Sequence, residues 1–282
     1  MTVSHASTLS AQTLIHALRL PESCRVDQRV PKKLLLENGA ATAADKRLIT
    51  EAIEEIQWVA ALKPNTIGVP DYRDTLREYL EIAVLAVTVR GVVKPASHSR
   101  LAELLHRAVP YPVLLLLIEG QSLTLSLAHK RWAQNEADKV VLDGGPISVT
   151  VLVTVSASLS EVNAANSFHP DPAEAAQAES AFIQSLSVTR QPQATLHALY
   201  QGWVDCVQAL LAARLTGSYQ TPTTPQQAAA RRQALADCER LEAEVSRLRA
   251  QAAKEKQMAR QVELNLTLKR VQAELAAARR QL

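Results

Sequence analysis

A helix signal opens the patterned part of the chain. Thr42 and Asp45 are spaced as in a capping box, and the apolar residues that follow them recur on one helical face. The pattern therefore predicts a helix over residues 43–57. Two apolar runs follow, at residues 58–62 and 80–90, and both predict strands. The second run is rich in valine, so we expect it to lie inside a sheet with both faces covered.

Strand patterns also dominate the next part of the chain. Residues 113–118 form a continuous apolar run and residues 123–127 alternate leucine with hydroxyl side chains, so together they predict a β-hairpin. Residues 139–142 and 147–155 flank the turn signal Asp143-Gly144-Gly145-Pro146 and repeat this pattern. Because helices alternate with partly antiparallel strands, the sequence predicts an α+β fold, a mixed sheet with flanking helices.

The last third of the chain has helical patterns only. Residues 172–216 predict two helices that form a hairpin against the sheet domain, and residues 217–225, which carry two prolines, predict a linker. Residues 226–282 hold no glycine or proline and are rich in strong helix formers, so they predict one long helix.

Apolar residues of this long helix step by three and four positions, as in the seam of a coiled coil. The seam consists of Leu241, Val245, Leu248, Leu264, Leu268, Val271 and Leu275. It changes phase near residues 254–256, where a stutter or a kink is expected. Because such a helix is only marginally stable alone, the sequence predicts a coiled-coil partner, either a second copy of the chain or another protein. The plainer alternative is a helix that folds back on its own body.

These patterns divide the chain into five segments. They are an N-terminal segment (residues 1–30), an α+β sheet domain (31–160), a helical hairpin packed on it (172–216), a linker (217–225) and a coiled-coil helix (226–282). From Pro225 onward the chain carries 12 basic and 7 acidic residues, against 19 and 21 in the rest, so the tail is basic and the body is slightly acidic.

Composition excludes several classes of protein. Hydrophobic residues make up 47% of the chain, as in globular proteins, so wholesale disorder is excluded. Aromatic residues make up only 4%, which argues against a platform for stacking single-stranded bases. The three cysteines form no Cys-x-x-Cys pair, and the longest apolar run, residues 113–118, is far shorter than the roughly 20 residues of a membrane helix. With no basic segment at its start, the chain is expected to be cytoplasmic and not to span a membrane.

Several segments taken together resemble one bacterial family. They are residues 31–38 (PKKLLLEN), 53–58 (IEEIQW), 62–67 (LKPNTI), 109–113 (VPYPV), 128–131 (AHKR), 139–142 (KVVL), 199–205 (LYQGWVD), 212–217 (AARLTG), 254–257 (KEKQ) and 262–265 (VELN). In these segments the chain resembles the family catalogued as domain of unknown function 4391, over about residues 30–282. The resemblance implies no catalytic residue or cofactor. It implies a context, because family members tend to be encoded beside helicases and DNA methyltransferases in restriction-like clusters.

The residues themselves favour no common enzyme class. Walker, Rossmann and nucleophile-elbow motifs are absent, and only 8 glycines are present to build phosphate-binding loops. The seven histidines include no pair at metal-ligand spacing beside a glutamate or cysteine. The sequence therefore predicts no cofactor and no metal site.

A Mg²⁺-dependent nuclease is the sharpest enzymatic alternative, because it needs only two or three carboxylates at neighbouring strand ends and a lysine. The candidate carboxylates are Glu81, Glu119 and Asp143. Gln121 stands where that pattern would place the lysine. The plainer interpretation makes Glu119 and Asp143 solvated turn residues.

Two short basic runs are candidates for contact with nucleic-acid phosphates. One consists of His129, Lys130 and Arg131, and the other of Lys32 and Lys33. The plainer interpretation is that both runs are solvated strand ends or loops, since the body of the chain has a slight acidic excess.

The sequence therefore favours a non-catalytic accessory subunit of a bacterial DNA-processing or restriction-like, anti-phage complex. We expect it to oligomerise through the C-terminal coiled coil, or to dock there on a partner such as the helicase or DNA methyltransferase of its gene cluster. A divergent nuclease and a simple DNA-binding protein are the alternatives.

Overall fold

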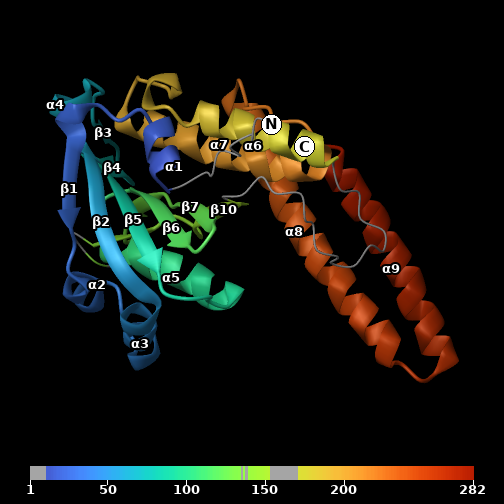
Figure 1. Cartoon of the computed structure of the whole chain (residues 1–282). Helices are drawn as coiled ribbons and strands as arrows, with labels where there is room; N and C mark the ends of the chain where they lie inside the picture. Colours follow the sequence, from blue (N-terminus) through green and yellow to red (C-terminus); the bar gives the residue numbers. More distant parts are fainter. Residues whose placement is uncertain (1–10, 135, 137–138, 153–170) are drawn as a thin grey trace, which may run out of the picture. The chain divides into compact units, whose positions relative to one another are not determined.

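The computed structural model describes residues 11–134, 136, 139–152 and 171–282. The chain divides into two compact units, shown together in Figure 1. The first comprises Met1–Asn163 and Glu179–Val207, and the second comprises Ala164–Ala178 and Gln208–Leu282. The division runs through α7 (Leu196–Thr216), whereas the sequence placed a linker at residues 217–225.

A six-stranded mixed sheet forms the centre of the first unit. In spatial order its strands are β1 (Arg25–Arg29), β2 (Ile53–Leu62), β5 (Ile82–Val89), β6 (Val113–Glu119), β7 (Ser122–Leu127) and β10 (Ile147–Leu152). Among the described strand pairs of this sheet, β5 and β6 alone run parallel, because α5 (Pro95–Ala108) carries the chain back between these two strands. The predicted α+β fold is confirmed.

Helices and two small sheets complete the first unit. The other helices at its start are α1 (Ala11–Ala17), α2 (Lys32–Asn38), α3 (Ala43–Ala52) and the short α4 (Pro64–Ile67). The small sheets pair β3 (Tyr72–Arg73) with β4 (Glu78–Tyr79), and β8 (Lys130–Trp132) with β9 (Val140–Leu142). Apolar side chains of α2, α3 and α5 share one buried core with the central strands, and Figure 1 shows these three helices grouped together.

The predicted helix over residues 43–57 begins where expected and ends early. The Thr42 side chain accepts a hydrogen bond from the Asp45 backbone N–H at 3.1 Å, as a helix cap does. The helix ends at Ala52, because Ile53 pairs with Val89 and starts strand β2. Isoleucines of this stretch suit a helical face and a strand equally well, and pairing with β5 decides between them.

The predicted hairpin around Asp143 is wrong. Residues 140–142 pair with β8, and Ile147 pairs with Leu127 of β7, so the two strands belong to different sheets. The part of the second strand that was predicted beyond Leu152 lies outside the described residues. The hairpin of residues 113–118 and 123–127 is confirmed as β6 and β7.

The α6 helix (Pro172–Ser185) and α7 lie where the helical hairpin was predicted. Within the first unit, the Trp203 indole N–H donates to the Leu186 carbonyl oxygen at 2.9 Å. The Tyr200 hydroxyl donates to the Val113 carbonyl oxygen at 2.7 Å and accepts from the Ala128 N–H at 2.8 Å. Tyr200 is fully buried, so it joins α7 to the sheet where β6 begins and β7 ends.

We expect Tyr200→Phe to lower the free energy of unfolding by about 1–3 kcal/mol, because it leaves a buried carbonyl and a buried N–H without their partner. Urea denaturation of the full chain measures this loss. Tyr72→Phe is the matched control, since the Tyr72 hydroxyl bonds only the partly exposed Asp74 carboxylate. Equal losses in the two variants would contradict the anchoring role of Tyr200.

Two antiparallel helices, α8 (Pro225–Lys254) and α9 (Met258–Arg279), form most of the second unit (Figure 1). The single long helix predicted over residues 226–282 is therefore two helices, and they separate where the stutter or kink was expected. The chain turns at residues 255–257, where the Glu255 carboxylate accepts hydrogen bonds from the N–H groups of Lys256 and Gln257, both at 2.8 Å. This side chain replaces the glycine or proline that usually marks such a break.

The predicted seam closes within one chain. Cys238, Leu241, Val245, Leu248, Val271, Leu275 and Ala278 form one buried cluster, with Leu215, Leu264, Leu268 and Leu282 packed against it. An ion pair between Glu242 and Arg279, at 2.8 Å, also joins the two helices. The phase change near residues 254–256 marks the turn, and the seam needs no second chain to cover it. Among the described residues, no helix combines the length and the apolar character needed to cross a bilayer.

Candidate functional site

Three hollows of the first unit meet at the segment from Val109 to Tyr111, between α5 and β6. Pro110 lines all three. The apolar hollow has a volume of about 380 Å³ and lies between α2 and strands β2 and β5. The lysine groove, of about 1110 Å³, runs from the ends of α2 and α5 to β9 and the glycines after it. The small hollow, of about 210 Å³, lies beside β8.

The local sequence explains why the chain opens here. Pro110 and Pro112 cannot continue the helix, so α5 ends at Ala108 and leaves part of the sheet uncovered. On the other side, Gly39 follows α2 in close contact with α5. A Cβ atom at Gly39 would lie 2.8 Å from both the Ala108 Cβ and the Leu104 carbonyl oxygen, so a larger residue would push the two helix ends apart.

Lys130 lies between the lysine groove and the small hollow and is only 3% exposed. Its ammonium donates to the His106 carbonyl oxygen at 2.7 Å and also to the Val109 carbonyl oxygen. Both carbonyls belong to the end of α5, so Lys130 satisfies groups that the helix leaves without partners. Burial lowers the pKa of Lys130 to about 7. An ammonium buried against these carbonyls does not reach a nucleic-acid phosphate, in contrast to the prediction for Lys130.

His106 is fully buried next to Lys130. Its Nε2 lies 3.0 Å from the Ser126 hydroxyl, which accepts in turn from the Ser148 hydroxyl at 2.9 Å. The Nδ1 atom has no hydrogen-bond partner within the described part of the chain. Burial, and then the neighbouring Lys130 charge, lower the pKa of His106 to about 3, so the ring is neutral near pH 7. A Ser–His pair without an acidic partner and without exposure cannot act as a nucleophile.

His129 belongs to a second polar cluster, formed with Tyr79, His197 and Gln201. Its Nε2 lies 2.9 Å from the Gln201 side-chain oxygen and its Nδ1 lies 2.5 Å from the Tyr79 hydroxyl. The amide oxygen only accepts, so Nε2 carries the proton and Tyr79 donates to Nδ1. Burial, followed by the nearby His197, lowers the pKa of His129 to about 4. These contacts hold a neutral histidine inside the fold and do not present it to a ligand.

The other basic candidates differ in accessibility. The Lys32 ammonium bonds the Ile53 carbonyl oxygen, and the Arg131 guanidinium lies 3.6 Å from the Asp143 carboxylate. Lys33 is 81% exposed and lies 3.7 Å from Glu37 one turn further along α2. Of the predicted phosphate contacts, Lys33 is therefore the most exposed.

The three candidate carboxylates are held in separate places. Glu81 lies 3.0 Å from the Lys63 ammonium, and the Asp143 carboxylate binds the Arg77 guanidinium. Glu119 accepts from the Val93 N–H at 2.5 Å and lies 3.8 Å from His98.

Strand register keeps Glu81 and Glu119 apart. Ala83 pairs with Val113 in the parallel β5–β6 ladder, so Glu81 precedes one end of the ladder and Glu119 closes the other end. With a rise near 3.3 Å per residue, these carboxylates are on the order of 20 Å apart. Across the residues that the structure describes, no group of three histidine, cysteine, aspartate or glutamate side chains could hold a metal ion.

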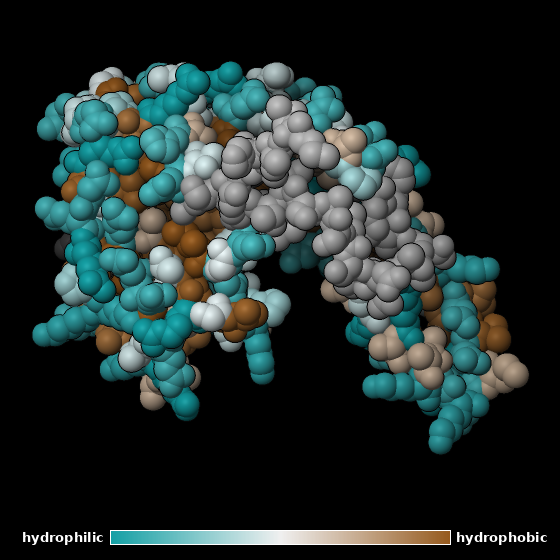
Figure 2. Space-filling model, in the orientation of Figure 1, coloured by the Kyte–Doolittle hydropathy of each residue, from teal (hydrophilic) through white to brown (hydrophobic). Residues whose placement is uncertain are grey.

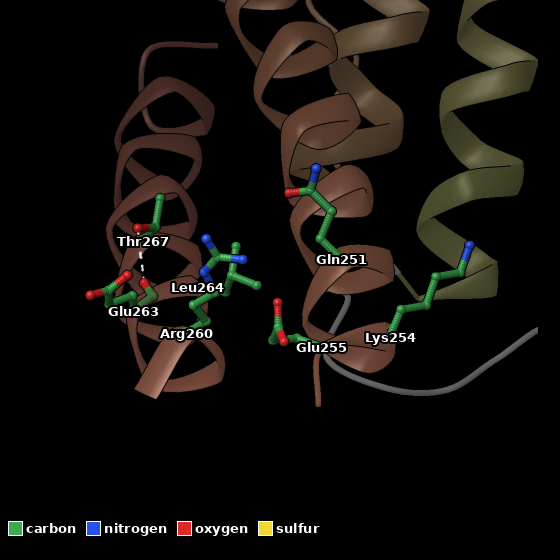
Figure 3. A pocket seen from close by; sticks show the side chains of 7 residues that line it. All are labelled: Gln251, Lys254, Glu255, Arg260, Glu263, Leu264 and Thr267. Carbon is green, nitrogen blue, oxygen red and sulfur yellow. Dashed lines mark hydrogen bonds between the residues drawn. The ribbon is translucent and has the colours of Figure 1, made fainter. Parts of the chain in front are cut away.

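A fourth hollow, of about 550 Å³, lies at the turn of the α8–α9 hairpin (Figure 3). Lys254 and Arg260 line it together with Glu255 and Glu263, and the Thr267 hydroxyl donates to the Glu263 carbonyl oxygen at 3.0 Å. Because positive and negative side chains line this hollow together, it does not favour a ligand of either charge.

The sequence missed the apolar hollow. Its aromatic residues are Trp58 and Tyr111, which are distant in the chain and come together only through the pairing of β2 with β5 and the end of α5. The available signal was the sequence Pro110-Tyr111-Pro112, where an aromatic ring stands between two helix-breaking residues.

Several segments that carry the family resemblance meet at these hollows. Residues 31–38, 109–113, 128–131 and 139–142 all contribute lining residues. Comparison with curated proteins and with solved structures gave no match. The family described as Domain of unknown function (DUF4391) matches residues 18–275, which is nearly the whole chain. The chain belongs to the DUF4391 family.

Proposed function

We propose that the chain is a non-catalytic accessory subunit of a bacterial DNA-processing or restriction-like complex, and that it pairs with a second copy of itself through the outer face of α9. One observation carries the proposed self-pairing. Met258, Val262 and Leu266 on α9 are 76%, 52% and 63% exposed, which is unusual for large apolar side chains.

These three residues form one stripe, because they recur every fourth position. On a helix with 3.6 residues per turn, the stripe lies opposite the side of α9 that packs on α8 through Leu264, Leu268 and the rest of the seam. A helix at the surface of a monomer has one apolar face, whereas α9 has two. Figure 2 shows hydrophobic residues at the surface of the hairpin.

The sequence along the stripe fits a second α9 running in the opposite direction. The large residues occupy its first half, the exposed Lys269 lies on the same face near the middle, and the small residues Ala273, Ala276 and Ala277 continue the face in the second half. In an antiparallel pair, the large residues of each copy would lie on the small residues of the other. A two-fold axis near Leu266 produces this match twice.

Charge supports the same arrangement. Glu263 and Arg270 are seven residues apart and lie on the same flank of the stripe. Around a two-fold axis near Leu266, Glu263 of one copy faces Arg270 of the other, as oppositely charged flanking residues do in coiled coils. Both side chains are exposed, and Arg270 makes only a loose contact with Glu274, at 3.9 Å.

The non-catalytic part of the proposal is supported by the carboxylates. Each candidate for metal binding already has a cationic or backbone partner, and strand register separates Glu81 from Glu119. No observation favours the nuclease alternative over the accessory role.

We expect the full chain to show twice its 30.7 kDa mass by light scattering, and the double variant Val262→Glu with Leu266→Glu to show the single mass. Four glutamates brought together at a two-fold interface would repel one another and lose their hydration. The matched control is Ala243→Glu with Ala250→Glu, which adds the same charge to exposed positions of α8. A monomeric wild-type chain at micromolar concentration, or a dimeric double variant, would contradict the proposal.

The accessory role has its own measurement. We expect the purified chain to form a stable complex with the helicase or DNA methyltransferase encoded beside it, detected by sedimentation of the mixed proteins. If the chain dimerises but binds neither enzyme, the self-association stands and the accessory role is wrong.

A further inference from the structure

We propose that Lys130 is a reactive amine, which captures a small aldehyde from the lysine groove as a reversible imine. The groove measures about 1110 Å³ and is the largest of the four hollows described above. Lys130 lines it together with His106, Ala108 and Pro110, at the end of α5. Proteins activate a lysine for imine formation by desolvating its amine in a pocket.

The hydrogen bonds of Lys130 leave its nitrogen able to react. A neutral amine has two N–H bonds and one lone pair. Its two N–H bonds are taken by the carbonyl oxygens of His106 and Val109, so the lone pair points away from both carbonyls. The amine is thus oriented before a ligand arrives, which favours attack on a carbonyl carbon.

Burial keeps a large share of this amine neutral. It lowers the pKa of Lys130 to about 7, so roughly half of the amine carries no proton at pH 7. A lysine with the ordinary pKa of 10.5 is neutral in only about one molecule in 3,000 at that pH. The groove supplies the space for a ligand, and burial supplies the lone pair that attacks it.

The charged residues that line the two hollows beside Lys130 do not change this state. They are Glu103, Arg107 and Lys139 in the groove, and Glu78 and Arg131 in the small hollow. Glu103 lies 2.6 Å from the Arg107 guanidinium, and Glu78 pairs with Arg73. His106 is neutral near pH 7. Within the described residues no carboxylate pairs with Lys130, so burial determines its charge.

The groups next to the amine favour an aldehyde over an acyl donor. An acyl transfer places a negative charge on the attacked oxygen, and that charge needs hydrogen-bond donors nearby. The carbonyl oxygens of His106 and Val109 only accept. The nitrogen of a protonated imine keeps one N–H, which donates to either carbonyl. Both carbonyls belong to the end of α5, where the helix dipole favours a positive charge.

The reaction needs only the amine, the aldehyde and water. The lone pair of the amine bonds to the aldehyde carbon, and the π electrons of the C=O bond move to the oxygen. This oxygen takes up the proton that the nitrogen releases. The hydroxyl group, protonated by the solvent, then leaves as water, and a C=N double bond remains. Hydrolysis reverses these steps and returns the free lysine.

The groove admits a small molecule but not a nucleic-acid backbone. Lys130 is only 3% exposed, so a reagent has to enter a hollow to reach the amine. Apolar side chains form much of the groove, among them Ala41, Val140, Leu142 and Pro146. A water molecule takes about 30 Å³ of the liquid, so the groove holds on the order of 35 heavy atoms. An aromatic aldehyde fits within this volume.

The probe is benzaldehyde, mixed with the full chain and with sodium cyanoborohydride, which reduces an imine to a stable amine. Peptide mass spectrometry measures the benzyl group on Lys130, and free Nα-acetyllysine in the same mixture is the reference. We expect Lys130 to react at least about tenfold faster than the reference at pH 7. The ratio of the two rates should fall roughly 50-fold between pH 7 and pH 9, because only the reference gains much neutral amine over this range.

Two substitutions test entry through the groove. Ala41→Phe places a ring at an exposed position that lines the groove and should slow labelling of Lys130 several-fold. Ala44→Phe makes the same change at an exposed position of α3 outside the groove and should leave the rate unchanged. Circular dichroism confirms that both variants are folded.

Three results would overturn the proposal: an unlabelled Lys130, a rate ratio that does not change with pH, or equal labelling of the two alanine variants. The outcome is independent of the proposed self-pairing, because Lys130 belongs to the first unit and α9 to the second.

Discussion

Replacing Lys130 with methionine is expected to change the pH dependence of stability by up to about 5 kcal/mol between pH 7 and pH 10.5. The pKa of Lys130 is about 7 in the fold, because burial disfavours the ammonium, and 10.5 is its ordinary value. Between these two values the unfolded chain holds a proton that the folded chain lacks. Raising the pH through this window therefore stabilises the folded wild type. Below pH 7 the fold bears the full free-energy cost of burying the charged Lys130 ammonium.

The methionine variant has no amine that titrates at this position. It also loses the hydrogen bonds that Lys130 donates to the carbonyl groups at the end of α5. Without the ammonium, the carbonyls of His106 and Val109 lack a buried donor, which costs about 1–3 kcal/mol each. The neutral amine of the wild type still donates to these carbonyls at high pH. We therefore expect the two proteins to be close in stability near pH 6, and the wild type to be clearly more stable near pH 10.

Urea unfolding of both proteins at pH 6, 7, 8, 9 and 10 measures the difference, and effects common to both proteins cancel. Lys139→Met is the control, because Lys139 lines the same groove but its side chain is 54% exposed. Parallel stability curves for wild type and Lys130→Met would show that the ammonium keeps its ordinary pKa in the fold.

Lys130 also shows how far the sequence could predict the site. His129, Lys130 and Arg131 form a basic run, and a run of like residues carries no sign of which side chain is buried. The fold separates them. Lys130 caps α5, His129 bonds Tyr79 and Gln201, and Arg131 pairs with Asp143. Each of these partners is distant in sequence, so the roles depend on tertiary contacts that local pattern does not contain.

The fold was more predictable where local signals decide it. The cap at Thr42, the buried strand β5 and the hairpin of β6 and β7 follow from spacing and alternation alone. The sequence-based predictions were wrong where strand pairing determines the secondary structure or the partner of a segment. Ile53 to Gln57 joined a strand because β5 was available as a neighbour, and residues 140–142 paired with β8 instead of their neighbour in sequence. Periodicity predicts which face of an element is apolar but not which element covers that face.

In the C-terminal hairpin, a substitution in the apolar seam can test which element covers the apolar face of α8. We expect Leu248→Asp to destabilise the α8–α9 hairpin by at least about 4 kcal/mol, since it removes a buried leucine side chain and places a charge between two packed helices. Leu248 is 3% exposed and packs in the cluster that joins α8 to α9. Helices of 30 and 22 residues depend on this cluster, so the helical signal in circular dichroism should fall at a much lower urea concentration.

The matched control is Leu266→Asp, which introduces the same residue on the exposed stripe of α9, where the leucine is 63% exposed. Leu266→Asp should keep the helical signal and lose self-association, whereas Leu248→Asp should lose the helical signal at every protein concentration. Concentration matters because a seam closed within one chain does not regain stability by mass action, while a seam between two chains does. If concentrating Leu248→Asp restores its helices, the seam joins two molecules and α8 and α9 of one chain are not partners.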